Sequence, residues 1–244
     1  MTSTAPTPIR NDRNLARQQR FWTRQAVSWD HGAGNNPGLV KVVSKVVELS
    51  DARPEDHAVD LGCGSGQVTL ALAPRVASVA AIDISEKMIR LLADNAAAKG
   101  ITNIDGRAIP VEQLEFEPGT VDIVVTNYAL HHLRDADKPV LVRRAYGWLR
   151  PGGRLVIGDM MFGRGGDQRD REIIASKVVL LLKMGPGGWW RIVKNGARFL
   201  FRTQERPVSM AAWQKMMVDA GFTDVQGVQV VNEAAVVRGV KPGV

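Results

Sequence analysis

Short apolar runs alternate with amphipathic stretches along most of this chain. Runs of strand character occupy 58–61, 76–83 and 121–125, and the stretches between them have apolar residues at helical spacing. Strands that are apolar on both faces and separated by helices are typical of a parallel sheet covered on both sides. The pattern therefore predicts an α/β protein with a Rossmann-like, doubly wound and mostly parallel sheet.

The same pattern predicts the remaining elements. The segment 31–38 is expected to be a loop because of its Gly, Asn and Pro content. A tight turn at 150–153 leads into a strand at 154–158, and Gly221 ends the last helix. The predicted helices are 14–29, 39–49, 68–73, 86–99, 138–149 and 209–220, and the last two predicted strands are 225–231 and 234–239.

Composition indicates how the chain is organised. Residues 1–12 are rich in Thr, Pro and Ser and lack periodicity, which predicts a disordered N-terminus before one domain over 13–244. Within that domain, residues 163–206 form a predicted helical insertion between the fifth strand and the last helix. The insertion carries ten basic and four acidic side chains, so most of the net charge of +7 belongs to it.

Cysteine usage and hydropathy restrict the compartment and the class of site. Cys63 is the only cysteine, so no internal disulfide can form, which suits a reducing cytoplasm. No apolar run approaches the roughly 20 residues that span a bilayer, and the N-terminus lacks the apolar stretch of a secretory signal. With four histidines and one cysteine, no dedicated transition-metal site is expected.

The segment most informative about function is 60–66, Asp-Leu-Gly-Cys-Gly-Ser-Gly. It joins a predicted strand to a predicted helix, and its glycines let the backbone approach a ligand where a β-carbon would collide. Arrangements of this kind bind nucleotides. Glycine-rich turns also occur in ordinary strand-to-helix connections, so the neighbouring residues decide between the two interpretations.

Three features favour a cation that contains adenosine. Asp83 ends the next predicted strand, 17 residues after Gly66, where a carboxylate can accept hydrogen bonds from ribose hydroxyls. Asp60 precedes the glycines, which disfavours a pyrophosphate and suits a positively charged ligand. Gln67 stands where the dinucleotide-binding pattern requires glycine. A sulfonium ion with an amino-acid tail and an adenosine satisfies all three conditions, whereas a nicotinamide dinucleotide does not.

With these motifs in order, the chain resembles the class I S-adenosylmethionine-dependent methyltransferases, particularly the small-molecule branch that includes the ubiquinone and menaquinone C-methyltransferases. The resemblance covers residues 20–160 and the C-terminal strands, with matching motifs at 122–127, 130–133, 149–153 and 219–222. It implies a seven-stranded sheet, S-adenosyl-L-methionine as cofactor and a methyl-transfer reaction. It also implies that 163–206 form a lid over the acceptor.

The resemblance assigns a set of cofactor-binding residues. The glycine-rich segment would hold the methionine portion and Asp83 the ribose, while Ile84 and Met88 would contact the adenine. Trp29 would cover the cofactor, and structural packing is the alternative role for this N-terminal aromatic residue. The expected set is Asp60, Gly62, Cys63, Gly64, Gln67, Asp83, Ile84, Met88, Arg107, Ala108, Asn127 and Trp29.

One position departs from the family pattern. Members commonly carry Gly-Asp-Ala after the third strand, where the Asp binds the adenine amino group. The matching residues here are Gly106, Arg107 and Ala108. Because arginine cannot accept that hydrogen bond, we expect the adenine to be recognised by the backbone or by a neighbour such as Asp105.

Candidate catalytic residues follow the predicted strand 121–125. Methyl transfer is an in-line displacement, for which the protein must align the acceptor, exclude water and, for some acceptors, remove a proton. His132 is the first candidate for the base or orienting residue, followed by His131 and Tyr128. The alternative is that both histidines serve the structure and that alignment alone drives the reaction.

The acceptor is less defined than the cofactor. Residues 189–202 form a predicted amphipathic helix with Arg191, Lys194, Arg198 and Arg202 on one face. This helix either lies on an anionic membrane and admits a lipophilic acceptor, or packs its apolar side on the core with its basic side in water. In both cases we expect a small hydrophobic or aromatic acceptor, such as a quinone or a lipid.

Two other function classes stay open as alternatives. The high positive charge is compatible with an RNA or protein substrate that uses the basic insertion. Nucleic acid is not the expected partner, because 127–129 lacks the Asn-Pro-Pro-aromatic motif of base-amino methyltransferases and the sequence has no recognisable RNA-binding module. The second alternative is a protein that binds S-adenosylmethionine without transferring its methyl group.

Overall fold

A computed structural model describes residues 12–33, 35–163, 171, 172, 175, 179 and 206–243. Residues 1–11 of the predicted disordered N-terminus lie outside the described residues. So do most of the predicted insertion 163–206 and the whole of its predicted amphipathic helix at 189–202. The structure therefore describes the sheet, the helices that cover it and the N-terminal helix.

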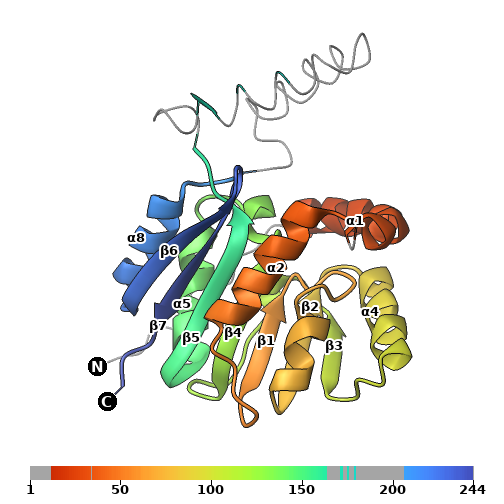
Figure 1. The fold of residues 1–244 in the computed structure, drawn as a ribbon, viewed down its shortest axis with the longest axis horizontal. Helices are drawn as coiled ribbons and strands as arrows, with labels where there is room; N and C mark the ends of the chain where they lie inside the picture. Colours follow the sequence, from red (N-terminus) through yellow and green to blue (C-terminus); the bar gives the residue numbers. More distant parts are fainter. Residues whose placement is uncertain are drawn as a thin grey trace.

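Seven strands in the described part of the chain form one sheet, in the order β3-β2-β1-β4-β5-β7-β6 (Figure 1). Strands β1 to β5 are parallel to one another, whereas β7 is antiparallel to both β5 and β6. The strands are β1 His57–Leu61, β2 Ser78–Asp83, β3 Ile104–Ala108, β4 Val121–Asn127, β5 Leu149–Met160, β6 Thr223–Val231 and β7 Ala234–Val240. This arrangement confirms the predicted doubly wound, mostly parallel α/β sheet.

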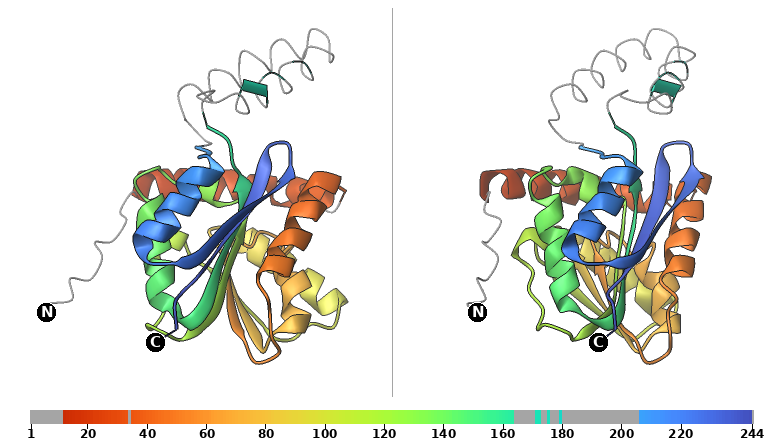
Figure 2. Two further views of the ribbon diagram at one scale, coloured as in Figure 1. Left: turned by 60° about the vertical axis from the view of Figure 1, so that its left-hand side comes forward. Right: turned by 90° about the vertical axis from the view of Figure 1, so that its left-hand side faces the viewer.

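Helices cover both faces of the sheet, as Figure 2 shows. Helices α2, α3 and α4 lie on one face, and α5 and α8 lie on the other. Alternate strand residues serve the two layers, since Ile123 and Val125 of β4 pack with α2 and Val124 packs with α5. The helices are α2 Pro37–Leu49, α3 Thr69–Leu72, α4 Glu86–Ala98, α5 Lys138–Trp148 and α8 Met210–Ala220, with short 3-10 turns at Ala73–Arg75, Val111–Gln113 and Leu130–His132.

Helix α1, Asp12–Ala33, lies across the carboxyl ends of the strands (Figures 1 and 2). Gln18 of α1 donates to the backbone oxygen of His132, which follows β4. Thr23 is hydrogen-bonded to Ser85, which follows β2. Ligands of doubly wound sheets bind at this edge, so α1 covers the place where a ligand is expected.

The structure corrects the predicted loop at 31–38. Helix α1 continues to Ala33, and α2 begins at Pro37. The side-chain oxygen of Asn36 accepts hydrogen bonds from the backbone N–H groups of Gly38 and Leu39, and so caps α2. Asn at the cap and Pro in the first turn are start signals for a helix, so the composition that indicated a loop in fact marks the start of a helix.

Two further segments belong to other elements than the sequence predicts. Gly106 and Arg107 lie inside β3 and not after it, because Arg107 pairs with Ile82 of β2. The predicted tight turn at 150–153 belongs to β5. Two backbone hydrogen bonds keep these residues in the strand. The N–H of Gly152 donates to the oxygen of Lys241, and the N–H of Lys241 donates to the oxygen of Gly153. Both differences arise from pairing with distant strand residues.

Candidate functional site

The glycine-rich segment after β1 is held against two neighbouring strands. The backbone N–H groups of Gly62 and Cys63 both donate to the oxygen of Ile82 in β2, at 2.7 and 2.9 Å. Gly62 has a φ of +73°, and a β-carbon there would come within 2.3 Å of the Ala129 side chain after β4. Glycine is therefore required at this position by both conformation and space. We call residues 62–66 the glycine loop.

Asp83, at the end of β2, ties the glycine loop to α4. One carboxylate oxygen accepts the N–H of Gly64 at 3.0 Å, and the other accepts the N–H of Ser85 at 2.8 Å. Burial raises the pKa of Asp83 above its ordinary value, and these backbone hydrogen bonds oppose that rise. The carboxylate thus fixes the loop while its remaining lone pairs stay available to a ligand.

Asp60 is a buried carboxyl group just before the glycine loop. It is 1% exposed, and its oxygen accepts the hydroxyl hydrogen of Thr69 at 2.6 Å. Burial raises the pKa of Asp60 to about 7, because desolvation disfavours the charged form more strongly than the Thr69 hydrogen bonds favour it. A positive ligand next to Asp60 would stabilise the carboxylate and lower this pKa.

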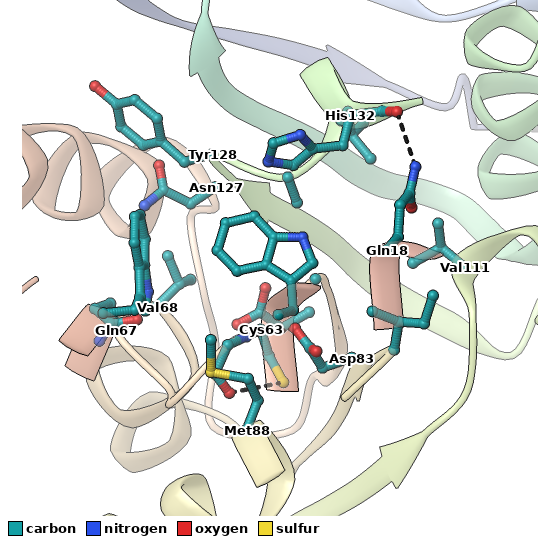
Figure 3. A pocket seen from close by; sticks show the side chains of 18 of the residues that line it. Gln18, Cys63, Gln67, Val68, Asp83, Met88, Val111, Asn127, Tyr128 and His132 are labelled. Atoms are coloured by element: carbon teal, nitrogen blue, oxygen red, sulfur yellow. Dashed lines mark hydrogen bonds between the residues drawn. The ribbon is translucent and has the colours of Figure 1, made fainter. Parts of the chain in front are cut away.

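These residues surround one cavity, which we call the inner cavity (Figure 3). Most of the residues expected from the sequence to bind the cofactor lie in its wall, since only Arg107 and Ala108 are outside it. Its wall consists of Gln18, Trp22, Trp29, Leu39, Asp60, Gly62, Cys63, Gly64, Gln67, Val68, Asp83, Ile84, Met88, Val111, Glu112, Asn127, Tyr128, Ala129, Leu130, His132 and Leu133.

Arg107 and Ala108 lie away from the inner cavity. Arg107 forms an ion pair with Asp105 at 2.6 Å, and its guanidinium lies over the Phe116 ring at 5.8 Å. The wall at this end is formed instead by the 3-10 turn after β3, which includes Glu112. Glu112 is 8% exposed, and burial raises its pKa. Sequence reasoning missed Glu112, although its place after a parallel strand was a usable signal.

Asn127, at the carboxyl end of β4, has a buried side-chain oxygen without a hydrogen-bond partner. Buried polar atoms are rarely left unpaired in proteins, so this oxygen is a candidate acceptor for a water or a ligand that donates to it. In Figure 3 the side chain of Asn127 lies next to that of Tyr128 at the cavity. Together with Asp60 and Asp83, Asn127 gives the inner cavity an excess of hydrogen-bond acceptors.

The two histidines differ in their surroundings. His131 is 4% exposed, and its ring Nδ1 lies 2.5 Å from a carboxylate oxygen of Asp159, near the end of β5. The other oxygen of Asp159 accepts the backbone N–H of His131 at 2.9 Å. This carboxylate therefore fixes the orientation of the His131 ring. Sequence reasoning missed Asp159, because the pairing depends on β4 and β5 lying side by side.

His132 and Tyr128 lie at the wall of the inner cavity. The His132 ring packs edge-on against Trp22 of α1, with centroids 5.1 Å apart. Tyr128 has a φ of +51°, and its backbone N–H donates to Gly158 at 2.9 Å. Burial is the main cause that raises the pKa of the Tyr128 phenol, so the group stays protonated at neutral pH. Tyr128 can therefore donate a hydrogen bond but is a poor base.

A second, wider cavity of about 780 Å³ adjoins the first, and we call it the outer cavity. Helix α1 forms most of its described wall, and Trp22 and Trp29 separate it from the inner cavity together with Tyr128 and His132. The described lining residues are Arg17, Gln18, Arg20, Phe21, Trp22, Arg24, Gln25, Ser28, Trp29, Gly32, Asn36, Leu39, Tyr128, His131, His132, Met160, Arg206 and Glu233.

Helix α1 is attached to α4 by a side-chain hydrogen bond, and two of its tryptophans contact each other. Asn95 of α4 donates to the side chain of Asp30 and to the backbone oxygen of Ser65, each at 3.1 Å. Trp22 and Trp29 pack edge to face with centroids 5.8 Å apart. Gln18 and Trp22 were not in the predicted site, because their position depends on how α1 crosses the sheet edge.

Two structural features do not occur among the described residues. None of the helices within 12–163 and 206–243 is both long and apolar enough to cross a membrane. In the same part of the chain, no three side chains among His, Cys, Asp and Glu come together in a way that could hold a metal ion. Cys63, which is buried, has a raised pKa because of desolvation, so its thiol stays protonated.

Known proteins similar to this chain include methyltransferases, the class that the glycine loop also indicates. A family model described as a methyltransferase domain matches residues 58–153. The chain is 29% identical over 114 residues to the uncharacterized methyltransferase YcgJ of Bacillus subtilis, covering 47% of this chain and 44% of that protein. It is 33% identical over 115 residues to the ubiquinone/menaquinone biosynthesis C-methyltransferase UbiE of Hydrogenovibrio crunogenus, covering 46% and 44%. The aligned part thus spans less than half the length of these two relatives.

The fold is also similar to that of solved structures. The crystal structure of geranyl diphosphate C-methyltransferase from Streptomyces coelicolor A3(2), in complex with Mg²⁺, geranyl diphosphate and S-adenosyl-L-homocysteine, matches with a TM-score of 0.63. The sequences are 16% identical, and the match covers 98% of this chain and 100% of that chain. At this identity the likeness concerns the fold. The strand order agrees with this likeness, so the chain has the Rossmann-like fold of methyltransferases, and its residues 58–153 match the methyltransferase-domain model.

Proposed function

We propose that the protein transfers the methyl group of S-adenosyl-L-methionine to a small acceptor that is hydrophobic or aromatic at its reacting end. The observation that carries the proposal is that the two cavities meet along a shared wall. The inner cavity contains the hydrogen-bond acceptors that a cationic cofactor needs. The outer cavity is lined by aromatic rings where it meets the inner cavity. The residues common to both are Gln18, Trp22, Trp29, Leu39, Tyr128 and His132.

The inner cavity fits this cofactor. Asp60 and the unpartnered oxygen of Asn127 would hold its positively charged amino-acid portion. Asp83 would accept the ribose hydroxyls with the lone pairs that its bonds to backbone N–H groups leave free. When bound, S-adenosylmethionine supplies an electrophilic methyl carbon on a sulfonium centre. Glycine at position 62 keeps the loop close to Ala129, where a side chain would not fit.

His131 is the residue best placed to accept a proton from the acceptor. Its Nδ1 is bonded to the Asp159 carboxylate, so Nδ1 carries the hydrogen and Nε2 is the ring nitrogen left with a lone pair. His131 lines the outer cavity, where an acceptor would lie. Asp159 also stabilises the imidazolium that forms when Nε2 takes a proton, as in other histidine–carboxylate pairs. This assignment places His131 ahead of His132, the first candidate from the sequence.

Alignment of the acceptor and exclusion of water fall to the aromatic residues of the shared wall. Trp22 contacts both Trp29 and His132, so the three rings form a continuous apolar surface. Tyr128, kept protonated, can donate a hydrogen bond to an oxygen of the acceptor. Holding the two reactants in contact in a water-poor site lowers the barrier to displacement at the methyl carbon.

Cofactor binding is the first test of the proposal. Isothermal titration of the purified protein with S-adenosyl-L-homocysteine should show binding to one site, whereas NADH should give no heat of binding. Asp83→Asn removes a negative charge and disturbs the loop, and should weaken the binding by about 30-fold or more. Asp94→Asn, at an exposed carboxylate on α4 outside the wall of the inner cavity, is the matched control and should leave the affinity unchanged.

Transfer itself is tested with S-adenosylmethionine labelled in its methyl group. Incubation with a panel of phenols, quinones, lipids, RNA and protein should label a small aromatic or lipophilic compound. Labelling of RNA or protein alone would contradict the proposed acceptor class and favour a macromolecular substrate. Binding of the homocysteine product without labelling of any compound would favour a protein that binds the cofactor without transferring its methyl group.

A further inference from the structure

The outer cavity is unevenly charged. Its described lining residues include four arginines and a single glutamate. Three of the arginines, Arg17, Arg20 and Arg24, are exposed residues of α1. Among the described residues, no carboxylate forms an ion pair with any of these three. The edge of this cavity therefore has a high density of positive charge next to an aromatic wall.

Helix geometry places the three arginines together. Arg17, Arg20 and Arg24 stand at i, i+3 and i+7, so they share one side of α1 over a length of about 10 Å. Trp22 and Trp29, at i and i+7, share the opposite side, which lines the inner cavity. The helix thus presents arginines at the outer rim of the cavity and tryptophans next to the cofactor site.

Phe21 connects the two sides. Its ring packs edge-on against Trp22, with centroids 5.2 Å apart. Arg17 and Arg24 are its neighbours on the helix surface at i−4 and i+3. An apolar path therefore runs from the shared wall along Trp22 and Phe21 to the arginines, over a distance of about one helix diameter, roughly 10 Å.

We infer that the acceptor is an amphipathic anion, with an apolar reacting end at Trp22 and His132 and a carboxylate or phosphate group held by the arginines at 17, 20 and 24. The inference rests on the proposed function and names the class of its acceptor. The planar guanidinium of arginine donates two parallel hydrogen bonds to such oxyanions, and neighbouring arginines add to the attraction.

The glutamate of the outer cavity does not oppose this arrangement. Glu233 lies in the turn between β6 and β7 and is one of the groups that raise the pKa of Tyr128. Arg206, the fourth arginine, is fixed near the histidines, because its backbone N–H donates to the oxygen of His131 at 2.6 Å. The rim formed by α1 therefore keeps its positive charge, while the Glu233 carboxylate affects the pKa of the Tyr128 phenol.

A matched pair of fluorescent probes tests the inference. The acid 6-hydroxy-2-naphthoate has a phenol at one end of a rigid apolar ring system and a carboxylate at the other, and its methyl ester lacks the charge. Fluorescence titration of protein saturated with S-adenosyl-L-homocysteine should show about tenfold tighter binding of the acid than of the ester. Higher salt should weaken binding of the acid and leave that of the ester unchanged.

The triple variant Arg17→Gln, Arg20→Gln, Arg24→Gln should weaken binding of the acid about tenfold and leave that of the ester unchanged. Glutamine keeps helix propensity, so the variant should fold, and the three single variants provide smaller steps in the same direction. The control Arg53→Gln, Arg75→Gln, Arg143→Gln removes three exposed arginines elsewhere and changes the net charge equally.

Equal binding of the acid by the two triple variants would overturn the inference, and so would an ester that binds as well as the acid. Failure of the wild-type protein to bind S-adenosyl-L-homocysteine would instead count against the proposed function, so the two failures are distinguishable. Sedimentation with phosphatidylglycerol vesicles, against phosphatidylcholine vesicles, identifies the source of the anion. If the wild-type protein sediments with phosphatidylglycerol vesicles and the α1 variant does not, the anion is a lipid headgroup. If the wild-type protein does not sediment with these vesicles, the anion belongs to a free acid.

Discussion

The inner and outer cavities are neighbours but are built in different ways. The inner cavity is formed by strand ends and a glycine loop, with backbone groups of Gly62, Cys63 and Gly64 bonded to β2 and to Asp83. The outer cavity is formed mainly by side chains of α1, several of which are exposed. One site depends on the main chain of a buried sheet, and the other on the side chains of one covering helix.

This difference explains why the sequence specifies the methyl donor but not the acceptor. The position of a backbone N–H in a paired strand tolerates few sequence changes, so a glycine loop and an acid at the next strand end indicate one kind of ligand. Side chains on a helix surface can be exchanged without loss of the fold. Changes in the inner cavity should therefore affect cofactor binding, and changes in the outer cavity should affect the acceptor.

The largest effect is expected from Gly62→Ala. The new β-carbon would lie 2.3 Å from the Ala129 side chain, at a φ of +73°. Conformational strain and overlap should together cost about 3 to 5 kcal/mol and weaken binding of S-adenosyl-L-homocysteine more than 100-fold. Gly100→Ala is the control, because Gly100 has a φ of +66° and no atom within 4 Å of the added carbon. Calorimetric titration of both variants with S-adenosyl-L-homocysteine measures the effect. Normal binding by Gly62→Ala would contradict the view that the inner cavity depends on the main chain.

The next effect concerns the histidine at the junction. Asp159→Asn removes the carboxylate that orients His131, and should lower kcat about 100-fold with any acceptor that must lose a proton. The affinity for S-adenosyl-L-homocysteine should stay within twofold, and the rise of the rate with pH should flatten. Asp135→Asn, at an exposed carboxylate in the segment that follows His131, is the control. An unchanged kcat and pH profile would show that Asp159 has only a structural role.

A smaller effect is expected from pH, in protein without ligand. The pKa of Asp60 is about 7 in the folded state, against 3.8 ordinarily, so the folded protein retains a proton that the unfolded chain releases between these values. Stability from this group is complete below pH 4 and falls as pH rises through 7. We expect the free energy of unfolding, measured with urea, to fall by about 2 kcal/mol between pH 5 and 8. This is less than the full pKa shift implies, because Asp60 borders the cavity.

Asp60→Asn is the comparison for that measurement. The variant lacks this titration, whereas Asp83 and Lys138, which also have shifted pKa values, remain in both proteins. The difference between the two pH profiles therefore isolates Asp60. Parallel profiles for wild type and variant would contradict a raised pKa and weaken the case for a cation-binding inner cavity.

The smallest effect is expected where the two cavities are linked. Asn95→Ala removes hydrogen bonds to Asp30 of α1 and to Ser65 of the glycine loop. The variant should hold α1 in place less strongly by about 1 kcal/mol. The KM for the acceptor should rise about fivefold, and hydrogen exchange in α1 should be faster. Asp94→Ala, an exposed neighbour on α4, should change neither quantity. If both cavities behave as one unit, cofactor affinity will fall by the same factor.

Local signals in the sequence predicted most of the fold. Strands β1, β2 and β4 were recognised because their apolar runs are short and flanked by turn residues. The boundary between α1 and α2 was placed wrongly, since Asn36 and Pro37 resemble loop residues until their capping role is seen. The extent of β3 was also missed, because Gly106 and Arg107 are exposed and join the sheet only through pairing with β2.

What the sequence determined by itself was the order of strands and helices, together with the glycine-rich segment and the acid at the end of β2 that line the inner cavity. These features depend on periodicity and on short spacings along the chain, which the sequence displays directly. Only the tertiary structure decided that Asp159 orients His131, that Glu112 replaces Arg107 in the cavity wall, and that α1 forms the outer cavity. Such contacts join residues from different strands and helices, and they exist only once the sheet has brought those elements together.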